Sequence, residues 1–169
     1  MSIAQMMLPE FDHEAANTRK CLERLPEDKF GYKPHEKSGT LGWLADHVAR
    51  LIGWTKETFT LTELDLSPDG KPFVPPPPPK TTAELLAIFD AGAAAGRAAL
   101  AAASDEDMMV LWSLKMNGQT IFQMPRAGCY RSMVMNHMIH HRAQLTVYMR
   151  LLDIPVPGLF GPSADEKSF

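Results

Sequence analysis

Cysteine is scarce in this 169-residue sequence, which excludes several classes of protein. Only two cysteines are present, Cys21 and Cys129, and they lack the Cys-x-x-Cys spacing of zinc ribbons and redox motifs. They would pair only if the fold brought them together, so free thiols in a reducing compartment are the simpler interpretation. The cysteine content therefore predicts a cytoplasmic protein without a disulfide framework.

An excess of basic charge, a long apolar run and a secretory leader are also lacking. The net charge of −3 and the pI near 6.1 give no electrostatic footprint for nucleic acid. We find no apolar run long enough to span a bilayer, and residues 1–5 do not have the charge and apolar pattern of a signal peptide. With 45% hydrophobic and 22% charged residues, we expect one soluble globular domain over residues 1–169, with neither nucleic acid nor membrane as partner.

Acidic residues are missing from one long segment, and this excludes a common metal site of helix bundles. No Asp or Glu occurs from Met108 through Leu152. A carboxylate-bridged di-iron site needs carboxylates from several helices and paired Glu-x-x-His motifs. Glu10 and His13 supply one such motif, but the last helix cannot supply its share. We therefore exclude a di-iron centre.

Apolar residues recur at helical spacing in four long segments. We expect helices over about residues 2–25, 38–60, 81–103 and 125–152. The first and third open with sequences typical of capping boxes, Ser2 with Gln5 and Thr81 with Glu84. Asn117-Gly118, between two short apolar runs, predicts a small hairpin before the last helix. The predicted fold class is all-α, a four-helix bundle with a long crossover.

Five consecutive prolines, Pro75 to Pro79, lie between the second and third predicted helices. Such a run favours a stiff polyproline II segment of about 3.1 Å per residue. Two interpretations arise: a ligand for a proline-binding module, or a crossover that connects two distant helix ends. We favour the crossover, because helices of one compact domain flank the run.

Three histidines within five positions are the strongest chemical signal. His137 and His141 are four residues apart, so on a helix they project from one face, which is otherwise apolar. Buried imidazoles need partners, because an unpaired buried polar group is costly. Two interpretations remain open at this point: core histidines hydrogen-bonded to backbone or hydroxyl groups, or ligands of a divalent metal ion.

A third ligand would decide between them. Of the remaining histidines, His35 lies in a loop and His13 lies beside two acids near the solvent edge, whereas His47 faces the interior from the second helix. Facing helices of a bundle join at the core, so His47 is the natural partner of His137 and His141. His140 is the weaker choice, because its side chain points away from this face. Three imidazoles leave open positions for water or substrate.

The order and spacing of several motifs resemble the DinB/YfiT-like superfamily of metal-binding four-helix bundles. The resemblance spans essentially the whole chain and rests on residues 25–30, 33–35, 40–47, 137–144 and 156–164. It implies that His47, His137 and His141 bind a divalent metal. Of the ions that imidazole accepts, we expect nickel or zinc, with iron or manganese as alternatives. Members of the superfamily commonly form homodimers, so the resemblance also implies a homodimer. Some members are transferases or isomerases that act with a low-molecular-weight thiol, which implies a small-molecule substrate.

From these observations we predict a metal-dependent thiol transferase that acts on reactive electrophiles. Two alternatives stay open: a non-catalytic, metal-stabilised binding or stress-response protein, and a bundle without metal whose histidines bond to one another. No general acid or base can be assigned. Four arginines of the last helix are candidates for holding an anionic thiol, Arg126, Arg131, Arg142 and Arg150, but for most of them we favour a solvated or structurally paired role. Trp43 and Trp54 are candidates for lining a pocket or for packing. For Cys129 we favour a structural over a catalytic role, and for Gln144 a contact around the metal ligands.

Overall fold

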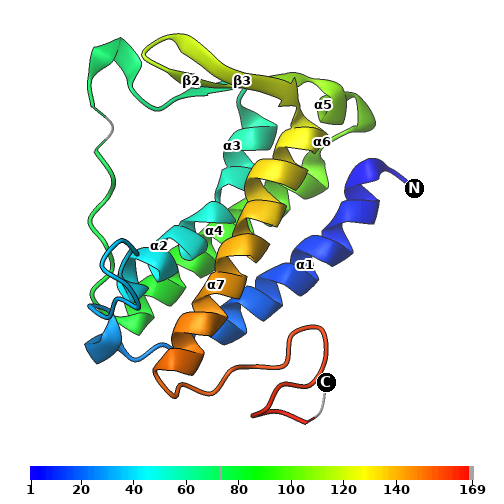
Figure 1. Cartoon of the computed structure of the whole chain (residues 1–169). Helices are drawn as coiled ribbons and strands as arrows, with labels where there is room; N and C mark the ends of the chain where they lie inside the picture. The colour runs from blue at the N-terminus through cyan, green and yellow to red at the C-terminus, as the bar shows by residue number, and fades with distance from the viewer. Residues whose placement is uncertain (73, 168–169) are drawn as a thin grey trace.

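Long helices make up most of the computed structural model, which describes residues 1–72 and 74–167. The helices are α1 (Ile3–Leu22), α2 (Leu41–Leu51), α3 (Trp54–Thr60), α4 (Thr82–Ala102), α5 (Asp105–Met109), α6 (Arg126–Cys129) and α7 (His137–Leu151). A π-helical segment, Tyr130–Asn136, joins α6 to α7, and two short 3₁₀ turns lie at Glu27–Lys29 and Pro68–Gly70. Helix α1 packs against both α4 and α7, α2 lies between α4 and α7, and α3 packs against α4 (Figure 1).

The helix starts follow the predicted capping residues. The Ser2 hydroxyl accepts a hydrogen bond from the Gln5 N–H, and Gln5 Oε1 accepts one from the Ser2 N–H. Together they form a complete capping box. The Thr40 hydroxyl caps α2 by accepting a hydrogen bond from the Trp43 N–H. Thr81 caps α4, but the Glu84 carboxylate accepts from the Lys80 N–H rather than from the cap itself. These caps satisfy N–H groups that have no partner within the helix.

The predicted second helix is interrupted at Gly53, so α2 and α3 are separate helices. There the backbone N–H bonds of Gly53 and Thr55 run to carbonyls three residues earlier, which tightens the turn. The break lies where α3 meets α4 closely: a Cβ on Gly53 would lie 3.6 Å from the Gly92 Cα. Glycines on both helices thus allow the two backbones to approach.

The same contact predicts the effect of Gly96→Ala. A Cβ at Gly96 would lie 2.9 Å from the Thr55 Cβ and 3.0 Å from the Ile52 carbonyl oxygen, so α4 and α3 must separate. We expect a loss of about 1–3 kcal/mol in the free energy of unfolding. Gly128→Ala is the control, because its nearest neighbour would be 3.7 Å away and the change favours helix. Urea unfolding followed by circular dichroism measures both; equal midpoints would contradict the close packing.

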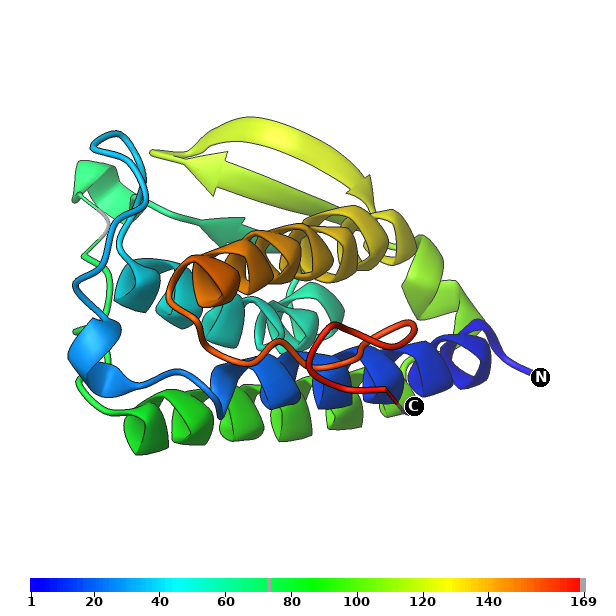
Figure 2. The same ribbon diagram turned by 60° about the horizontal axis from the view of Figure 1, so that its bottom comes forward.

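A three-stranded mixed sheet corrects the all-α prediction. The predicted hairpin is present, with β2 (Leu111–Met116) antiparallel to β3 (Gln119–Pro125), and its turn residues Asn117 and Gly118 have φ of 52° and 74°. A third strand, β1 (Glu63–Asp65), pairs in parallel with β2, in the order β1-β2-β3. The sheet lies beside α3 and the start of α6, on one side of the helices (Figures 1 and 2).

Helix α4 bears on the expectation that no apolar run is long enough to span a membrane. By length and composition alone, Thr82–Ala102 is long and apolar enough, with a mean hydropathy of 1.5. Core helices of globular proteins share these properties. Two of its charged residues pair with α1, Asp90 with Arg19 and Arg97 with Asp12. We therefore describe α4 as a helix of the bundle.

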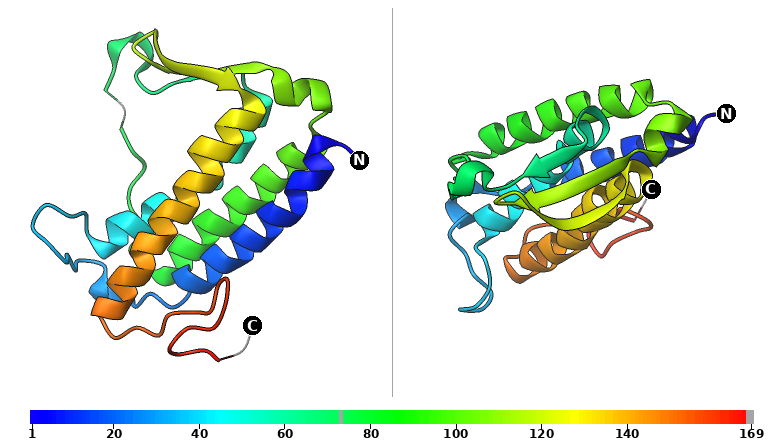
Figure 3. Two further views of the ribbon diagram at one scale, coloured as in Figure 1. Left: turned by 45° about the vertical axis from the view of Figure 1, so that its right-hand side comes forward. Right: turned by 90° about the horizontal axis from the view of Figure 1, so that it is seen from above.

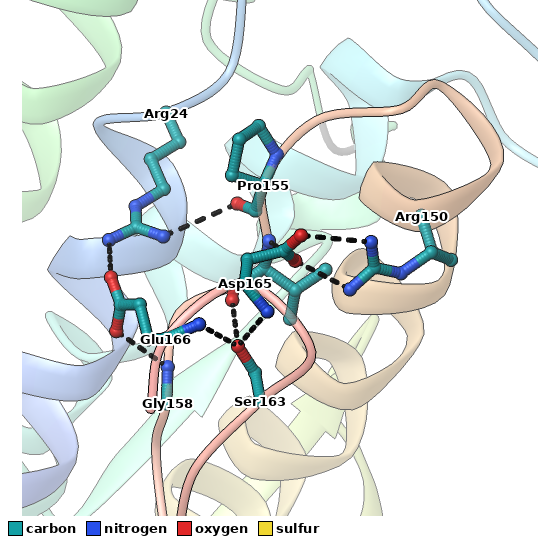
Figure 4. Close-up of polar contacts among 8 residues, drawn as sticks. Arg24, Arg150, Pro155, Gly158, Ser163, Asp165 and Glu166 are labelled. Atoms are coloured by element: carbon teal, nitrogen blue, oxygen red, sulfur yellow. Dashed lines mark hydrogen bonds and ion pairs between the residues drawn. The ribbon is translucent and has the colours of Figure 1, made fainter. Parts of the chain in front are cut away.

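The C-terminal segment, residues 153–167, folds back onto α1 and α7 (Figures 3 and 4). Arg150 of α7 pairs with Asp165 at 2.6 Å, and Arg24, just after α1, pairs with Glu166. These arginines hold the pKa of both carboxyl groups below the usual range. Earlier in the same segment, the centre of the Phe160 ring lies 5.6 Å from the Arg142 guanidinium carbon. The segment thus covers the side of the bundle where α1 meets α7.

Candidate metal centre

The fold brings three histidines together between α2 and α7. His47 lies in α2, and His137 and His141 lie one turn apart at the start of α7. One ligand nitrogen from each ring lies within 4.8 Å of the others, and all three residues are partly buried. Over residues 1–72 and 74–167 no other group of this kind is found. These are the three residues expected from the sequence; that they bind a metal stays a prediction.

A backbone carbonyl orients His137. Its Nδ1 lies 3.3 Å from the Met133 carbonyl oxygen, which an imidazole N–H can reach as donor. In a regular α-helix the backbone N–H of residue 137 would take that oxygen, but here it bonds to Val134 O at the end of the π-helical segment. The Met133 carbonyl is thus within reach of the His137 ring where the π-helical segment meets α7. With Nδ1 protonated, Nε2 of His137 presents a lone pair towards His47.

Gln144 orients His141 in the same manner. The His141 Nδ1 lies 2.7 Å from Gln144 Oε1, and the Gln144 amide nitrogen lies 3.1 Å from His140 Nε2. A consistent assignment has His141 donating to the amide oxygen while the amide N–H donates to His140. His141 then also turns an unprotonated Nε2 to the centre of the cluster. The exposed His140 meets the cluster through Gln144 and through an edge contact with the His141 ring, with centroids 4.9 Å apart.

Burial and mutual repulsion favour the neutral form of His47 and His137. Burial lowers the pKa of His47 to about 4, with the nearby His141 and His137 adding to the effect. Burial likewise lowers the pKa of His137, and His141 contributes. Neutral imidazole is the form that ligates metals, so at neutral pH these two rings need not lose protons first.

The donor set fits a divalent metal ion. A tetrahedral ion with bonds of 2.0–2.1 Å places two ligand nitrogens about 3.3 Å apart. The Nε2 atoms of His47 and His137 are 3.3 Å apart, and the ring centroids of the three histidines lie 4.7–5.1 Å from one another. A hydrogen bond between two of the rings is the metal-free alternative, but it would leave the third ring without a partner in the cluster.

A cavity of about 400 Å³ opens beside the cluster, with His47 and His137 in its wall. Its other lining residues are mostly apolar or aromatic, and they come from α2, α3, the sheet and the proline run: Trp43, Asp46, Arg50, Leu51, Trp54, Leu66, Pro75, Pro76 and Met116. Trp43 stacks on His47, with centroids 5.4 Å apart and planes at 6°. The two tryptophans were candidate pocket residues; the others were missed, because the sequence alone does not place them near His47.

Two sets of sequence candidates lie elsewhere. The arginines considered for an anionic thiol are each paired structurally with an acid: Arg126 with Asp107, Arg131 with Glu10, Arg142 with Glu14 and Arg150 with Asp165. Cys129 is buried against Trp112 and Leu114, and burial raises the pKa of its thiol, which disfavours the reactive thiolate. Cys21 is also buried, and both cysteines are free, as expected.

The hydrogen bond to His141 predicts the effect of Gln144→Ala. Without this acceptor the His141 ring loses its fixed orientation, so we expect affinity for zinc to fall about tenfold, near the lower end for loss of such a partner. Competition with a chromophoric chelator measures it. Thr146→Ala is the control, because its hydroxyl bonds only to the Ala143 carbonyl in the same helix. Equal affinities of wild type and Gln144→Ala would show that the ring is held without Gln144.

Comparison with known proteins agrees with this architecture. The model of the DinB family matches residues 1–167. The solved structure of a DinB-like protein from Bacillus cereus ATCC 10987 is similar, with a TM-score of 0.70, 22% identity and coverage of 94% of this chain and 98% of that one. The DinB-like protein YjoA of Bacillus subtilis gives 0.69, 17% identity and coverage of 91% and 96%. The uncharacterized protein YrdA of Bacillus subtilis (strain 168) is 43% identical over 44 residues, about a quarter of each chain.

Proposed function

The chain belongs to the DinB family, and from its three-histidine cluster we propose that it is a divalent-metal-dependent enzyme acting on a small molecule. The observation that carries the proposal is the convergence of three ligand nitrogens within 4.8 Å beside a cavity. Three protein ligands leave a coordination position free for a reactant, as in catalytic rather than closed structural sites. The cavity gives a reactant access to that position.

The reaction we propose is transfer of a low-molecular-weight thiol to a reactive electrophile. A divalent ion bound here would supply Lewis acidity, which lowers the pKa of a bound thiol or water towards neutrality. In the overall reaction a sulfur–carbon bond forms as the bond from carbon to the leaving group breaks, and the thiol proton departs with that group or to solvent. The contribution of the protein is to hold both reactants and to exclude water from the apolar cavity.

Metal identity, assembly and compartment complete the proposal. Imidazole nitrogen suits nickel and zinc, with iron and manganese as alternatives. We propose that the protein works as a homodimer in the cytoplasm, where its two free, buried cysteines stay reduced. Neither nucleic acid nor membrane is part of the proposed function.

A second function is favoured by one specific observation. The ligands come from two helices, His47 from α2 and the other two from α7, so a metal would tie these helices together. This supports a non-catalytic binding or stress-response protein in which the ion is purely structural. The two functions differ in whether an external ligand reaches the metal.

A cobalt-substituted sample distinguishes them. Visible absorption of Co²⁺ depends on its ligands, so titration with 2-mercaptoethanol should change the spectrum if a coordination position is exchangeable. Ethylene glycol, the oxygen analogue, is the control for non-specific solvent effects. A spectrum that does not respond to the thiol would reject the enzyme and favour the structural ion. Failure of the wild type to bind Co²⁺ at all would reject both.

A further inference from the structure

The proline run has a place in the structure that the proposed function does not use. Residues 75–79 run from the sheet side of the molecule to the start of α4, across the outer side of α2 (Figure 1). Arg50 of α2 holds the run, because its guanidinium donates to the Pro77 carbonyl oxygen at 3.2 Å while its Nε pairs with Asp46 at 2.7 Å. The crossover is therefore fastened to the helix that carries His47.

Two of the prolines line the cavity beside the histidines. Pro75 and Pro76 form part of its wall together with the tryptophans of α2 and α3. Proline has no backbone N–H, and its ring fixes φ, so this wall presents apolar rings on a backbone with little freedom to lose on binding. Such a wall is preorganised for an apolar partner.

The charge of the cavity points to the same class of ligand. Among its described lining residues one acid and one permanent base occur, Asp46 and Arg50, and they neutralise each other. The remaining surface, apart from the histidines, is indole, proline ring, leucine and methionine side chain. A volume of about 400 Å³ lies within the range of small-molecule sites, roughly 300–1,000 Å³. An uncharged aromatic group thus finds stacking partners and meets no unpaired charge.

We propose that this cavity binds an uncharged aromatic group of a small molecule between Trp54 and the prolines Pro75 and Pro76, next to the histidine cluster. On the proposed function, that group is the apolar body of the electrophile, and its reactive end faces the metal. The proline crossover is then a specificity-determining wall and not only a connection.

Binding of N-phenyl-1-naphthylamine, a neutral aromatic fluorophore, tests the cavity without any metal. We expect saturable binding to the metal-free protein, with energy transfer from tryptophan. Pro75→Ser combined with Pro76→Ser should weaken it at least fivefold. Pro78→Ser combined with Pro79→Ser is the matched control from the same run, because neither residue lines the cavity. Absence of binding, or equal weakening by both pairs of substitutions, would overturn the proposal.

A second titration separates this proposal from the proposed function. In zinc-loaded protein, benzohydroxamate and acetohydroxamate carry the same metal-binding group and differ in the phenyl ring. We expect benzohydroxamate to displace the fluorophore and to bind at least tenfold more tightly, with the preference reduced when Pro75 and Pro76 are replaced. Equal affinities would overturn the aromatic site. Binding of the fluorophore without binding of either hydroxamate would support the cavity and reject the exchangeable metal.

Discussion

Arg142→Met should lower the free energy of unfolding by about 3–5 kcal/mol, the usual cost of leaving one partner of a buried ion pair alone. The Arg142 and Glu14 side chains are 2% and 5% exposed, and Nη2 lies 2.6 Å from Oε2. Water therefore cannot replace the lost guanidinium. The remaining carboxylate would lie uncompensated between α1 and α7.

The contacts of Arg142 explain why the loss should be large. Its Nη1 also donates to the Glu14 carbonyl oxygen and to Thr18 Oγ1, at 3.2 and 3.1 Å. The Oε2 of Glu14 makes no hydrogen bond of regular geometry, so its link to Nη2 is an ionic contact more than a directional bond. Because the Phe160 ring covers the guanidinium, the substitution should also loosen the C-terminal segment.

Arg97→Met provides the control for this prediction. Arg97 pairs with Asp12 through two short contacts, yet the two side chains are 51% and 46% exposed. An exposed pair contributes at most about 1 kcal/mol. In urea unfolding, Arg142→Met should lose at least twice as much unfolding free energy as Arg97→Met. Adding Glu14→Leu to Arg142→Met should recover most of the unfolding free energy that Arg142→Met loses. Equal losses in the two single variants would contradict the importance of burial.

The sequence predicted the local features of the fold well because their causes lie within a few residues. The cap at Ser2 needs only Gln5, three positions away, and the hairpin needs only Asn117 and Gly118 at its turn. The spacing of His137 and His141 is a property of one helix. His47 required a further step, the rule that facing helices of a bundle join at the core.

The missed features depend on residues far apart in the chain. Strand β1 has three residues, too few for an alternating pattern to stand out, and it exists because β2, about fifty residues later, pairs with it. The helix break at Gly53 lies where the backbones of α3 and α4 approach closely, next to Gly92 of α4. Likewise, the proline run was correctly predicted as a crossover, but that Pro75 and Pro76 line the same cavity as Trp54 follows only from the fold.

Wild-type protein should contain about one divalent ion per chain after dialysis, and His137→Ala should contain only traces. With one of three imidazoles gone, affinity should fall by more than the 10–100-fold that loss of a supporting partner costs. Elemental analysis measures the content. At a free zinc concentration of about 100 times Kd, the wild type should gain about 2.7 kcal/mol in unfolding free energy, and the variant should gain almost none.

His140→Ala distinguishes a metal site from general histidine enrichment. His140 is exposed and is not one of the three residues whose ligand nitrogens converge, so this variant should keep its metal and most of its zinc-dependent stabilisation. If both variants lost metal equally, the ion would be bound by the surface of α7 and not between helices. If His137→Ala kept its metal, the cluster would be a set of core histidines bonded to one another. Loss of the metal in His137→Ala but not in His140→Ala would indicate a metal site between α2 and α7, because the Nε2 of His137 lies 3.3 Å from the Nε2 of His47.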